Sequence, residues 1–394
     1  MNGLNVPDSP AREALPIGIL AAAGFLSSAG ARVIDPLLAV ISGDFNVSVA
    51  ASAVFVAAFT LAYGFSQLLL GPVGDRVGKL RLMFVALCGY ALFTGACSLA
   101  TNLPTLTLAR ALAGAASAGL IPSCLAYIGD AVPFERRNLA ISKFLVGIVL
   151  AQILAGPLGG VFGQFVGWRG VFLLLSAASV VVAGVLRRAM RHAPETVGGK
   201  TFNPSLYGRL ARNSNARLLL MATLVEGAVM IGVFPFVAPF LHQEFDLPFA
   251  TVGLVLACFG IGALVYTRTA SRLIPALGES GLIAVGGGLI VLGLVGAMLA
   301  RRWEAFVGIE GMLGLGYFML HPVLQTRASE LLPDARATSV SVFVFVLFLG
   351  SSLGAMAFGA AIAAFGYRAG FGANAVIVSG LTLWLYRFVR DRPV

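Results

Sequence analysis

The chain has 394 residues, of which 58% are hydrophobic and 11% charged, and its formal net charge is +10 at pH 7. A soluble globular protein rarely carries so much apolar side chain, so the composition excludes most soluble classes and predicts a membrane protein. The basic balance would suit a nucleic-acid-binding protein. However, the Lys and Arg residues lie mostly between hydrophobic segments, where membrane orientation accounts for them. We therefore expect contact with membrane lipid and no nucleic-acid partner.

Apolar segments recur along the whole chain. Residues 82–109 and 337–367 carry no charge, and each is longer than the roughly 20 residues that cross a bilayer as one helix. Charges, prolines and turn residues divide the chain into twelve expected transmembrane helices, which makes the predicted fold an all-α membrane protein. The expected spans are 15–41, 49–73, 80–101, 104–130, 139–164, 169–188, 217–241, 249–274, 281–300, 303–329, 337–364 and 368–388.

The basic residues predict how the chain crosses the membrane. Of the 27 Lys and Arg residues, Arg32 and Arg110 lie inside spans, and 21 fall on the side that holds both termini. The opposite side holds only Arg169, Arg301, Arg302 and Arg368. Positive loops stay in the cytoplasm, so we expect a multi-pass protein of the cell (inner) membrane with both termini cytoplasmic. The first span resembles a signal peptide, but its flank lacks a basic cluster, which favours an uncleaved helix.

An arginine and an aspartate lie inside the first span, in ARVIDPLLAV (31–40). Ionisable residues within a membrane are costly and mark functional sites by default. Arg32 and Asp35 are three residues apart and share one helix face. Pro36 removes a helical hydrogen bond and can bend the helix there. We expect Asp35 to carry the coupled proton. We expect Arg32 to tune the pKa of Asp35 or to bind substrate.

The loop after the second span reads GPVGDRVGKLR (71–81). It resembles the signature loop of the major facilitator superfamily, and the matching residues are Gly71, Asp75, Arg76, Gly78 and Lys79. The resemblance implies two pseudo-symmetric six-helix bundles, with this loop as a latch between them on the cytoplasmic side. Asp130, at the end of the fourth span, is an expected partner of Arg76 or Lys79. A solvated charged turn is the alternative, and the equivalent loop of the second half lacks the Asp-Arg pair.

The fifth span contains AGPLGGVFG (155–163), which is rich in glycine around a proline. It resembles the Gly-Pro motif of the fifth span in superfamily antiporters, including drug/proton exchangers. The residues that match are Gly156, Pro157, Gly159, Gly160 and Gly163. Small residues four apart also occur in ordinary close helix packing, which is the alternative interpretation. Together with the proline and the position, the pattern favours antiport.

The chain also predicts two related halves. Its only long polar stretch separates residues 1–188 from 217–394, so we expect two six-helix bundles joined by a cytoplasmic linker, 189–216. Gly114 and Pro122 recur 200 residues later as Gly314 and Pro322. GWRGVF (167–172) recurs as GYRAGF (366–371) at an offset of 199. Many secondary transporters share this plan, with the substrate bound between the halves.

Further ionisable residues lie in the fourth, seventh and tenth spans. In the superfamily these spans and the first line the central cavity, so the resemblance places Arg110, Glu226, Glu310 and His321 there. We expect Glu226 and Glu310 to join Asp35 in proton coupling, and Arg110, His321 and Gln325 to join Arg32 in binding substrate. Arg110 and Glu310 occupy equivalent repeat positions, so a structural ion pair between them is the alternative. For His321, a packing role beside Pro322 is equally open.

Other protein classes lack their characteristic motifs here. The four cysteines have no CxxC spacing, so we expect neither a bound metal nor a disulfide framework. PETVGGKT (194–201) has Pro194 where a phosphate loop needs its first glycine, which argues against an ATP-driven pump. The three histidines are far apart in the expected topology and no HExxH or GxSxG occurs, so we expect neither an enzyme nor a cofactor.

The sequence therefore predicts a monomeric secondary transporter. Its expected activity is export of a small organic molecule, such as a drug-like or sugar-like metabolite, in exchange for protons. The alternative is proton-linked uptake of an organic anion, with Arg32 and Arg110 as carboxylate ligands. A membrane receptor or scaffold would leave the repeat, the loop motif and the buried charges unexplained.

Overall fold

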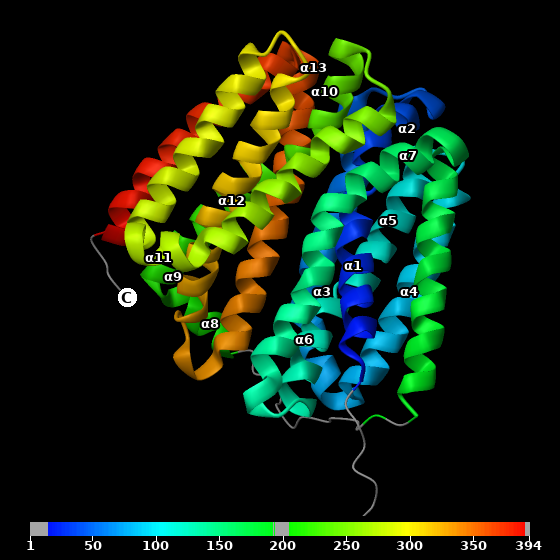
Figure 1. Ribbon diagram of the computed structural model, residues 1–394, viewed down its shortest axis with the longest axis vertical. Coiled ribbons are helices and arrows are strands. Elements are labelled where there is room, and N and C mark those ends of the chain that lie inside the picture. The colour runs from blue at the N-terminus through cyan, green and yellow to red at the C-terminus, as the bar shows by residue number, and fades with distance from the viewer. Residues whose placement is uncertain (1–14, 192, 194–204, 391–394) are drawn as a thin grey trace, which may run out of the picture.

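The structure, a computed structural model, describes residues 15–191, 193 and 205–390 (Figure 1). Helices and helical turns make up its regular structure, and the described residues contain no strand. The α-helices are α1 (Ile17–Arg32), α2 (Leu38–Asp44), α3 (Val49–Val77), α4 (Lys79–Ser98), α5 (Leu103–Ser117), α6 (Leu120–Ala131), α7 (Phe134–Ala189), α8 (Ser205–Arg212), α9 (Ser214–Glu226), α10 (Val237–Phe245), α11 (Phe249–Leu299), α12 (Ala305–Ser329) and α13 (Arg336–Arg390). The short turns are η1 (Asp35–Leu37), η2 (Gly227–Ile231), η3 (Phe234–Phe236) and η4 (Pro333–Ala335).

Three of the helices cross the bundle twice. α7, α11 and α13 have 56, 51 and 55 residues, whereas roughly 20 residues cross a bilayer. Each reverses at a glycine with positive φ: Gly167 at 67°, Gly278 at 62° and Gly366 at 79°. Glycine adopts this region without the strain that a Cβ would cause. Among the described residues nine helical segments are long and apolar enough to span a membrane, and three of them are double. The predicted fold of twelve transmembrane helices is confirmed.

The first and seventh spans are broken near their buried charges. α1 ends at Arg32, η1 begins at Asp35, and Pro36 occupies the second position of that turn. In the equivalent seventh span, α9 ends at Glu226 and is followed by η2 and η3, with Pro235 in the same place within η3. A proline lacks the N–H that the helix ladder needs, so each break falls where the sequence removes a hydrogen bond.

The two halves repeat one close helix contact. A Cβ on Gly114 would collide with the carbonyl oxygen of Phe59, and a Cβ on Gly314 would collide with that of Phe259. Both members of the second pair lie 200 residues after those of the first. Glycine lets membrane helices approach until their backbones touch, as α3 and α5 do in one half and α11 and α12 in the other. The sequence repeat is therefore also a repeat in space.

An arginine closes one end of each half in the same manner. We call the side where α1 begins the N-terminal side, and the opposite side, where α2 ends, the far side. On the far side Arg169 donates to Asp44 at 3.2 Å, and Arg368 donates to Glu244 at 2.9 Å. Each guanidinium also donates to a main-chain carbonyl at the end of a neighbouring helix. These paired contacts hold the ends of the helices together within each half.

The halves lie side by side and meet along α3 with α13 and α7 with α11 (Figure 1). A Cβ on Gly359 would lie 3.0 Å from the carbonyl oxygen of Ala50. A Cβ on Gly160 would collide with the carbonyl oxygen of Phe249. All four residues lie in the far-side portions of their helices. The seam between the halves is thus tightly closed on the far side.

The described part of the expected linker contains α8. Leu210 of this helix packs with Ala216 at the start of α9 and with Leu332 of the C-terminal half. Arg209 donates to Asp334 at 2.7 Å, and this hydrogen bond lowers the pKa of the Asp334 carboxyl. Residues 194–204 lie outside the described residues, and the boundaries 1–188, 189–216 and 217–394 stay predictions.

The glycine contacts generate a stability prediction. Gly314→Ala should lower the free energy of unfolding by about 1–3 kcal/mol, because the added methyl group must displace the backbone of Phe259. Gly308→Ala is the matched control, since a Cβ there meets nothing within 4 Å in the same helix. The measurement is the thermal unfolding midpoint of the purified protein in detergent. Equal midpoints for the two variants would contradict the packing argument.

Candidate functional site

Five of the expected site residues are ionisable groups on the first, fourth, seventh and tenth spans that are largely or fully buried. Asp35 is 1% exposed, Arg110 2%, Glu226 1% and Glu310 0%. Arg32 is partly exposed and lies at the end of α1, three residues before Asp35. Hydrocarbon and protein interiors solvate charge poorly, so each of these groups needs a local partner or is costly to keep charged.

Arg32 contacts the opposite half through aromatic rings. Its guanidinium carbon lies 3.8 Å from the ring centroid of Phe234 and 5.5 Å from that of Phe259. A guanidinium over an aromatic face gains a cation–π attraction that strengthens when water is excluded. One of its nitrogens, Nη1, is buried without a hydrogen-bond partner among the described residues. Arg32 therefore links the two halves while retaining a free donor.

Two carboxylates near Arg32 lack a hydrogen-bond partner among the described residues. In the part of the chain that the structure describes, both oxygens of Asp35 and both oxygens of Glu310 are buried and unsatisfied. Arg32 interacts electrostatically with both, although Asp35 belongs to its own half and Glu310 to the other. Asp35 also interacts electrostatically with Arg110 of its own half, whereas Glu310 has Arg32 as its one cationic partner among the described residues. Because neither arginine donates a hydrogen bond to these carboxylates, both are suited to taking up a proton or a cation.

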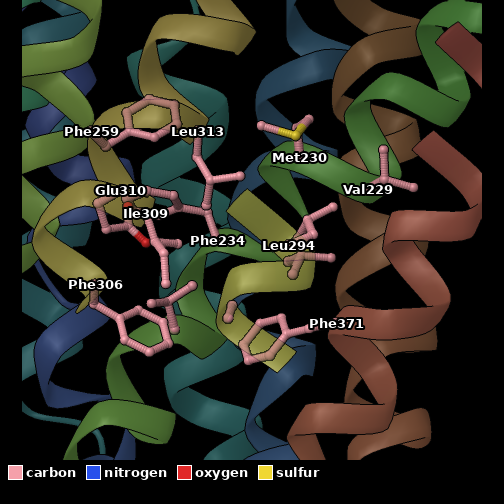
Figure 2. Close-up of a pocket in the computed structure, with 13 residues that line it drawn as sticks. Val229, Met230, Phe234, Phe259, Leu294, Phe306, Ile309, Glu310, Leu313 and Phe371 are labelled. Carbon is pink, nitrogen blue, oxygen red and sulfur yellow. The ribbon is translucent and has the colours of Figure 1, made fainter. Parts of the chain in front are cut away.

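Glu310 faces a small internal cavity in the C-terminal half (Figure 2). The cavity has a volume of about 20 Å³, room for about one water molecule, and its walls are otherwise apolar. Phe234 also lines the cavity, and the Arg32 guanidinium lies over its ring. The Phe234 ring therefore lies between Arg32 and the cavity. A carboxylate here has neither a polar wall nor bulk solvent to stabilise its charge.

Glu226 and His321 form a polar pair between the seventh and tenth spans. His321 Nδ1 lies 3.0 Å from Glu226 Oε1, while Oε2 of Glu226 is buried without a partner among the described residues. The imidazole stacks on Tyr317 with ring centroids 5.0 Å apart. A protonated Nδ1 of His321 can donate to the Glu226 carboxylate. A proton can therefore pass between these two side chains within the site. The sequence placed His321 in the same cavity but did not pair it with Glu226.

Arg110 and Glu310 do not form the ion pair that their equivalent positions suggested. Arg110 instead donates to the carbonyl oxygen of Gly30 at 2.9 Å, and its guanidinium carbon lies 4.1 Å from the Phe59 ring centroid. Both contacts are within its own half. The alternative of a structural ion pair is therefore wrong for this structure, because the pseudo-symmetry puts the two residues at matching places in separate bundles.

Sequence reasoning missed several polar side chains that join neighbouring spans. Ser27 and Ser117 place their hydroxyl oxygens 2.8 Å apart between the first and fourth spans. Tyr63 meets Phe348 of the opposite half at a centroid distance of 4.8 Å. Ser117 follows Arg110 by seven residues, as Tyr317 follows Glu310, and residues seven apart share a helix face. This seven-residue spacing was the sequence signal that could have placed Ser117 and Tyr317 on the same helix faces as Arg110 and Glu310.

The expected latch residues form one tight contact within the N-terminal half. Lys79 donates to Asp130, joining the start of α4 to the end of α6, and Lys79 is only 7% exposed. Gly78 separates α3 from α4 with φ of 93°, a region that other residues rarely adopt. Arg76 is exposed, whereas the surroundings of Gly71 and the side chain of Asp75 lie outside the described part of the chain.

The glycine-rich motif of the fifth span contacts both halves. Gly156 and Gly160 face the carbonyl oxygens of Gly253 and Phe249 in α11, across the seam. On the other face, a Cβ on Gly159 would collide with the carbonyl oxygen of Val33 and lie 3.5 Å from Pro36. Gly163 likewise faces the Leu37 side chain. Pro157 lies within the helix among these glycines. The motif therefore holds α7 against the broken helix that carries Asp35.

Gln325, the remaining residue expected to bind substrate, lies one helical turn beyond His321 on α12. Its side chain is exposed, unlike those of the buried charges. It is nearer the N-terminal side, because α12 ends on that side four residues later. Gln325 is therefore separate from the buried group around Arg32.

Comparison with known proteins identifies the family. The family model of the Major Facilitator Superfamily matches residues 20–355 and 219–394. The chain belongs to this superfamily. It is 24% identical over 328 residues to the MFS-type transporter YceJ of Bacillus subtilis, covering 82% of this chain and 83% of that protein. It is 25% identical over 344 residues to a chloramphenicol resistance protein of Streptomyces lividans, covering 86% and 87%.

Solved structures share the fold. A bacterial homologue of the human lysosomal transporter Spinster, in an inward-facing and unoccupied conformation, superposes with a TM-score of 0.81. The two chains are 19% identical, and the match covers 96% of this chain and 98% of the other. Together with the family match, this shows that the chain is a membrane-spanning transporter and not an enzyme.

Proposed function

We propose that this transporter exports a small organic molecule, drug-like or sugar-like, in exchange for protons. The observation that supports the proposal best is the set of buried carboxylates Asp35, Glu226 and Glu310 on the cavity spans. Five of their six oxygens have no hydrogen-bond partner among the described residues. Unpaired carboxylates inside the membrane are costly to keep charged, and binding a proton removes that charge.

The direction of transport rests on two further observations. The Gly-Pro motif lies in the fifth span and packs against the segment that contains Asp35. Similar proteins include the chloramphenicol resistance protein and a probable sugar efflux transporter of Pasteurella multocida, 25% identical over 234 residues, covering 57% of this chain and 55% of that protein. Both favour export over uptake.

We infer that the N-terminal side faces the cytoplasm of a cell (inner) membrane, because most Lys and Arg residues lie there. With this orientation, the side of the seam away from the cytoplasm is closed, so the structure is not outward-open. The Arg32 contact with Phe234 then belongs to a state that is closed to the outside, and we expect it to break when the far side opens. Protonation of Asp35 or Glu310 weakens the hold of the carboxylates on Arg32, which connects proton binding to that opening.

The alternative function is proton-linked uptake of a small organic anion. The observation that favours it is the unsatisfied Nη1 of Arg32, which could donate to a substrate carboxylate. Arg110 also has one buried nitrogen, Nε, without a partner among the described residues, but its Nη1 donates to Gly30 and its guanidinium lies against Phe59 within its own half.

Transport by the purified protein in vesicles with an imposed pH gradient separates the two functions. Antiport accumulates substrate on the acidic side, because protons flow down their gradient in exchange for it. Symport accumulates substrate on the alkaline side and would overturn the export proposal. The compound panel includes chloramphenicol, neutral sugars and small carboxylates. Folded protein that shows no substrate-induced proton flux with any of them would contradict both functions.

Substitution of the carboxylates should impair proton coupling while substrate binding persists. Asp35→Asn and Glu226→Gln should each reduce pH-driven transport at least about tenfold, which corresponds to about 1.4 kcal/mol of lost coupling. Exchange of labelled for unlabelled substrate without a gradient should persist, because it needs no net proton movement. Glu304→Gln, which removes an exposed carboxylate, serves as the control. Normal pH-driven transport by both site variants would remove these residues as coupling sites.

We also propose that the loop of Gly71, Asp75, Arg76, Gly78 and Lys79, with Asp130, gates the N-terminal side. Asp130→Asn leaves buried Lys79 without its partner and should favour the state open on that side. Labelling of an Ala53→Cys variant, with Cys88 and Cys258 replaced by Ser, reports opening of the far-side seam near Gly359. Its rate should fall about two- to fivefold, the range for a partly exposed ion pair. An unchanged rate, or an equal fall with Glu330→Gln, would count against the gate.

A further inference from the structure

A groove runs along the outer surface of the N-terminal half, between α4 and the second span of α7. Its volume is about 440 Å³, within the range of about 300–1,000 Å³ that small-molecule sites occupy. α4 contributes Phe84, Cys88 and Leu92 to the walls, and α7 contributes Val180 and Gly184. These positions recur at four-residue intervals, so the groove follows one face of each helix.

The groove is closed at its deep end and wider toward the N-terminal side. At the deep end, Ser176 donates to the carbonyl oxygen of Ala91 at 2.7 Å. A Cβ on Gly95 would lie 3.0 Å from the Ser176 hydroxyl oxygen, so the two helices are in close contact there. In contrast, a Cβ on Gly184 meets nothing within 4 Å. The space left by this glycine is part of the groove.

The length of the groove matches one leaflet of a bilayer. Phe84 and Gly95 are eleven residues apart on α4, which is about 16 Å at about 1.5 Å per residue. Half of the hydrocarbon core is about 15 Å thick. Phe84 lies five residues from the start of α4, so the groove begins near the membrane surface on the N-terminal side and reaches toward the midplane.

The mouth of the groove is positively charged. Arg187 lines it, and its guanidinium carbon lies 5.6 Å from the ring centroid of Phe84, which helps to fix its position. Arg81 precedes Phe84 by three residues on the same face of α4, and Arg191 follows Arg187 by four residues. An apolar slot of leaflet length that ends in arginines has the charge pattern of a lipid, with its acyl chain below and its phosphate at the surface.

We propose that this groove is a binding site for an anionic glycerophospholipid, with one acyl chain between α4 and α7 and the phosphate at Arg187. The site lies outside the buried charges of the transport pathway and does not depend on the direction of transport. It joins two spans that are far apart in the sequence of the N-terminal half. A bound lipid therefore stabilises the packing of the third span against the sixth.

Native mass spectrometry of the full-length protein in detergent tests the proposal, with phosphatidylglycerol and phosphatidylcholine as probes. The wild-type protein should bind phosphatidylglycerol about fivefold more tightly, since one arginine near the phosphate contributes about 1 kcal/mol. Arg187→Gln should remove this preference. Gly184→Leu fills the groove and should weaken binding of both lipids at least about fivefold. Thermal unfolding shows that each variant is folded.

Two matched controls come from the other half. Arg387→Gln removes an arginine 200 residues further on, in the last turn of α13. Gly380→Leu adds a side chain at another glycine whose Cβ meets nothing within 4 Å. Both should bind lipid as the wild type does. Equal affinity of the wild type for the two lipids would overturn the proposal, as would equal losses in Arg187→Gln and Arg387→Gln. If Gly184→Leu binds lipid as the wild type does but loses a dimer that native mass spectrometry detects in the wild type, the groove binds a second copy of this chain and the lipid proposal is overturned.

Discussion

The cost of holding charge away from water governs the centre of this protein. Arg110 meets that constraint with a carbonyl oxygen and an aromatic face, and Glu226 meets part of it with His321. Arg32 is stabilised by a cation–π contact with Phe234 of the other half. The carboxylates of Asp35 and Glu310 are left unsatisfied among the described residues. Such unsatisfied carboxylates fit the proton coupling proposed above, because a group whose hydrogen bonds are all made in one state gains little from binding a proton there.

The halves share a backbone plan but differ in chemistry. Gly114 on Phe59 and Gly314 on Phe259 set the same helix contact in each half, so the scaffold is symmetric. At the equivalent positions 110 and 310, however, one half carries an arginine and the other a glutamate. Closely packed glycines fix where the cavity helices lie, whereas the side chains that project from them are free to diverge. The result is a symmetric frame around an asymmetric set of charges.

Much of the fold could be predicted from the sequence because it depends on local chemistry. Span length follows from bilayer thickness, the break at Pro36 follows from a missing N–H, and the reversals lie at glycines such as Gly167 and Gly366 within a visible repeat. The location of the ionisable residues on four particular spans was also readable. Their partners were not, because the equivalence of Arg110 and Glu310 suggested an ion pair that the two-bundle geometry does not form.

The sequence by itself determined that this chain crosses a membrane twelve times in two related halves and that Asp35, Glu226 and Glu310 lie within those crossings. Hydrophobicity, helix length and the positions of proline and glycine are properties of the chain, and they set these features without reference to distant residues. Only the tertiary structure decided that Arg32 lies on Phe234, that His321 meets Glu226 and that the far side is closed. Each of these joins helices that are separate in the sequence, so it depends on how the bundles pack.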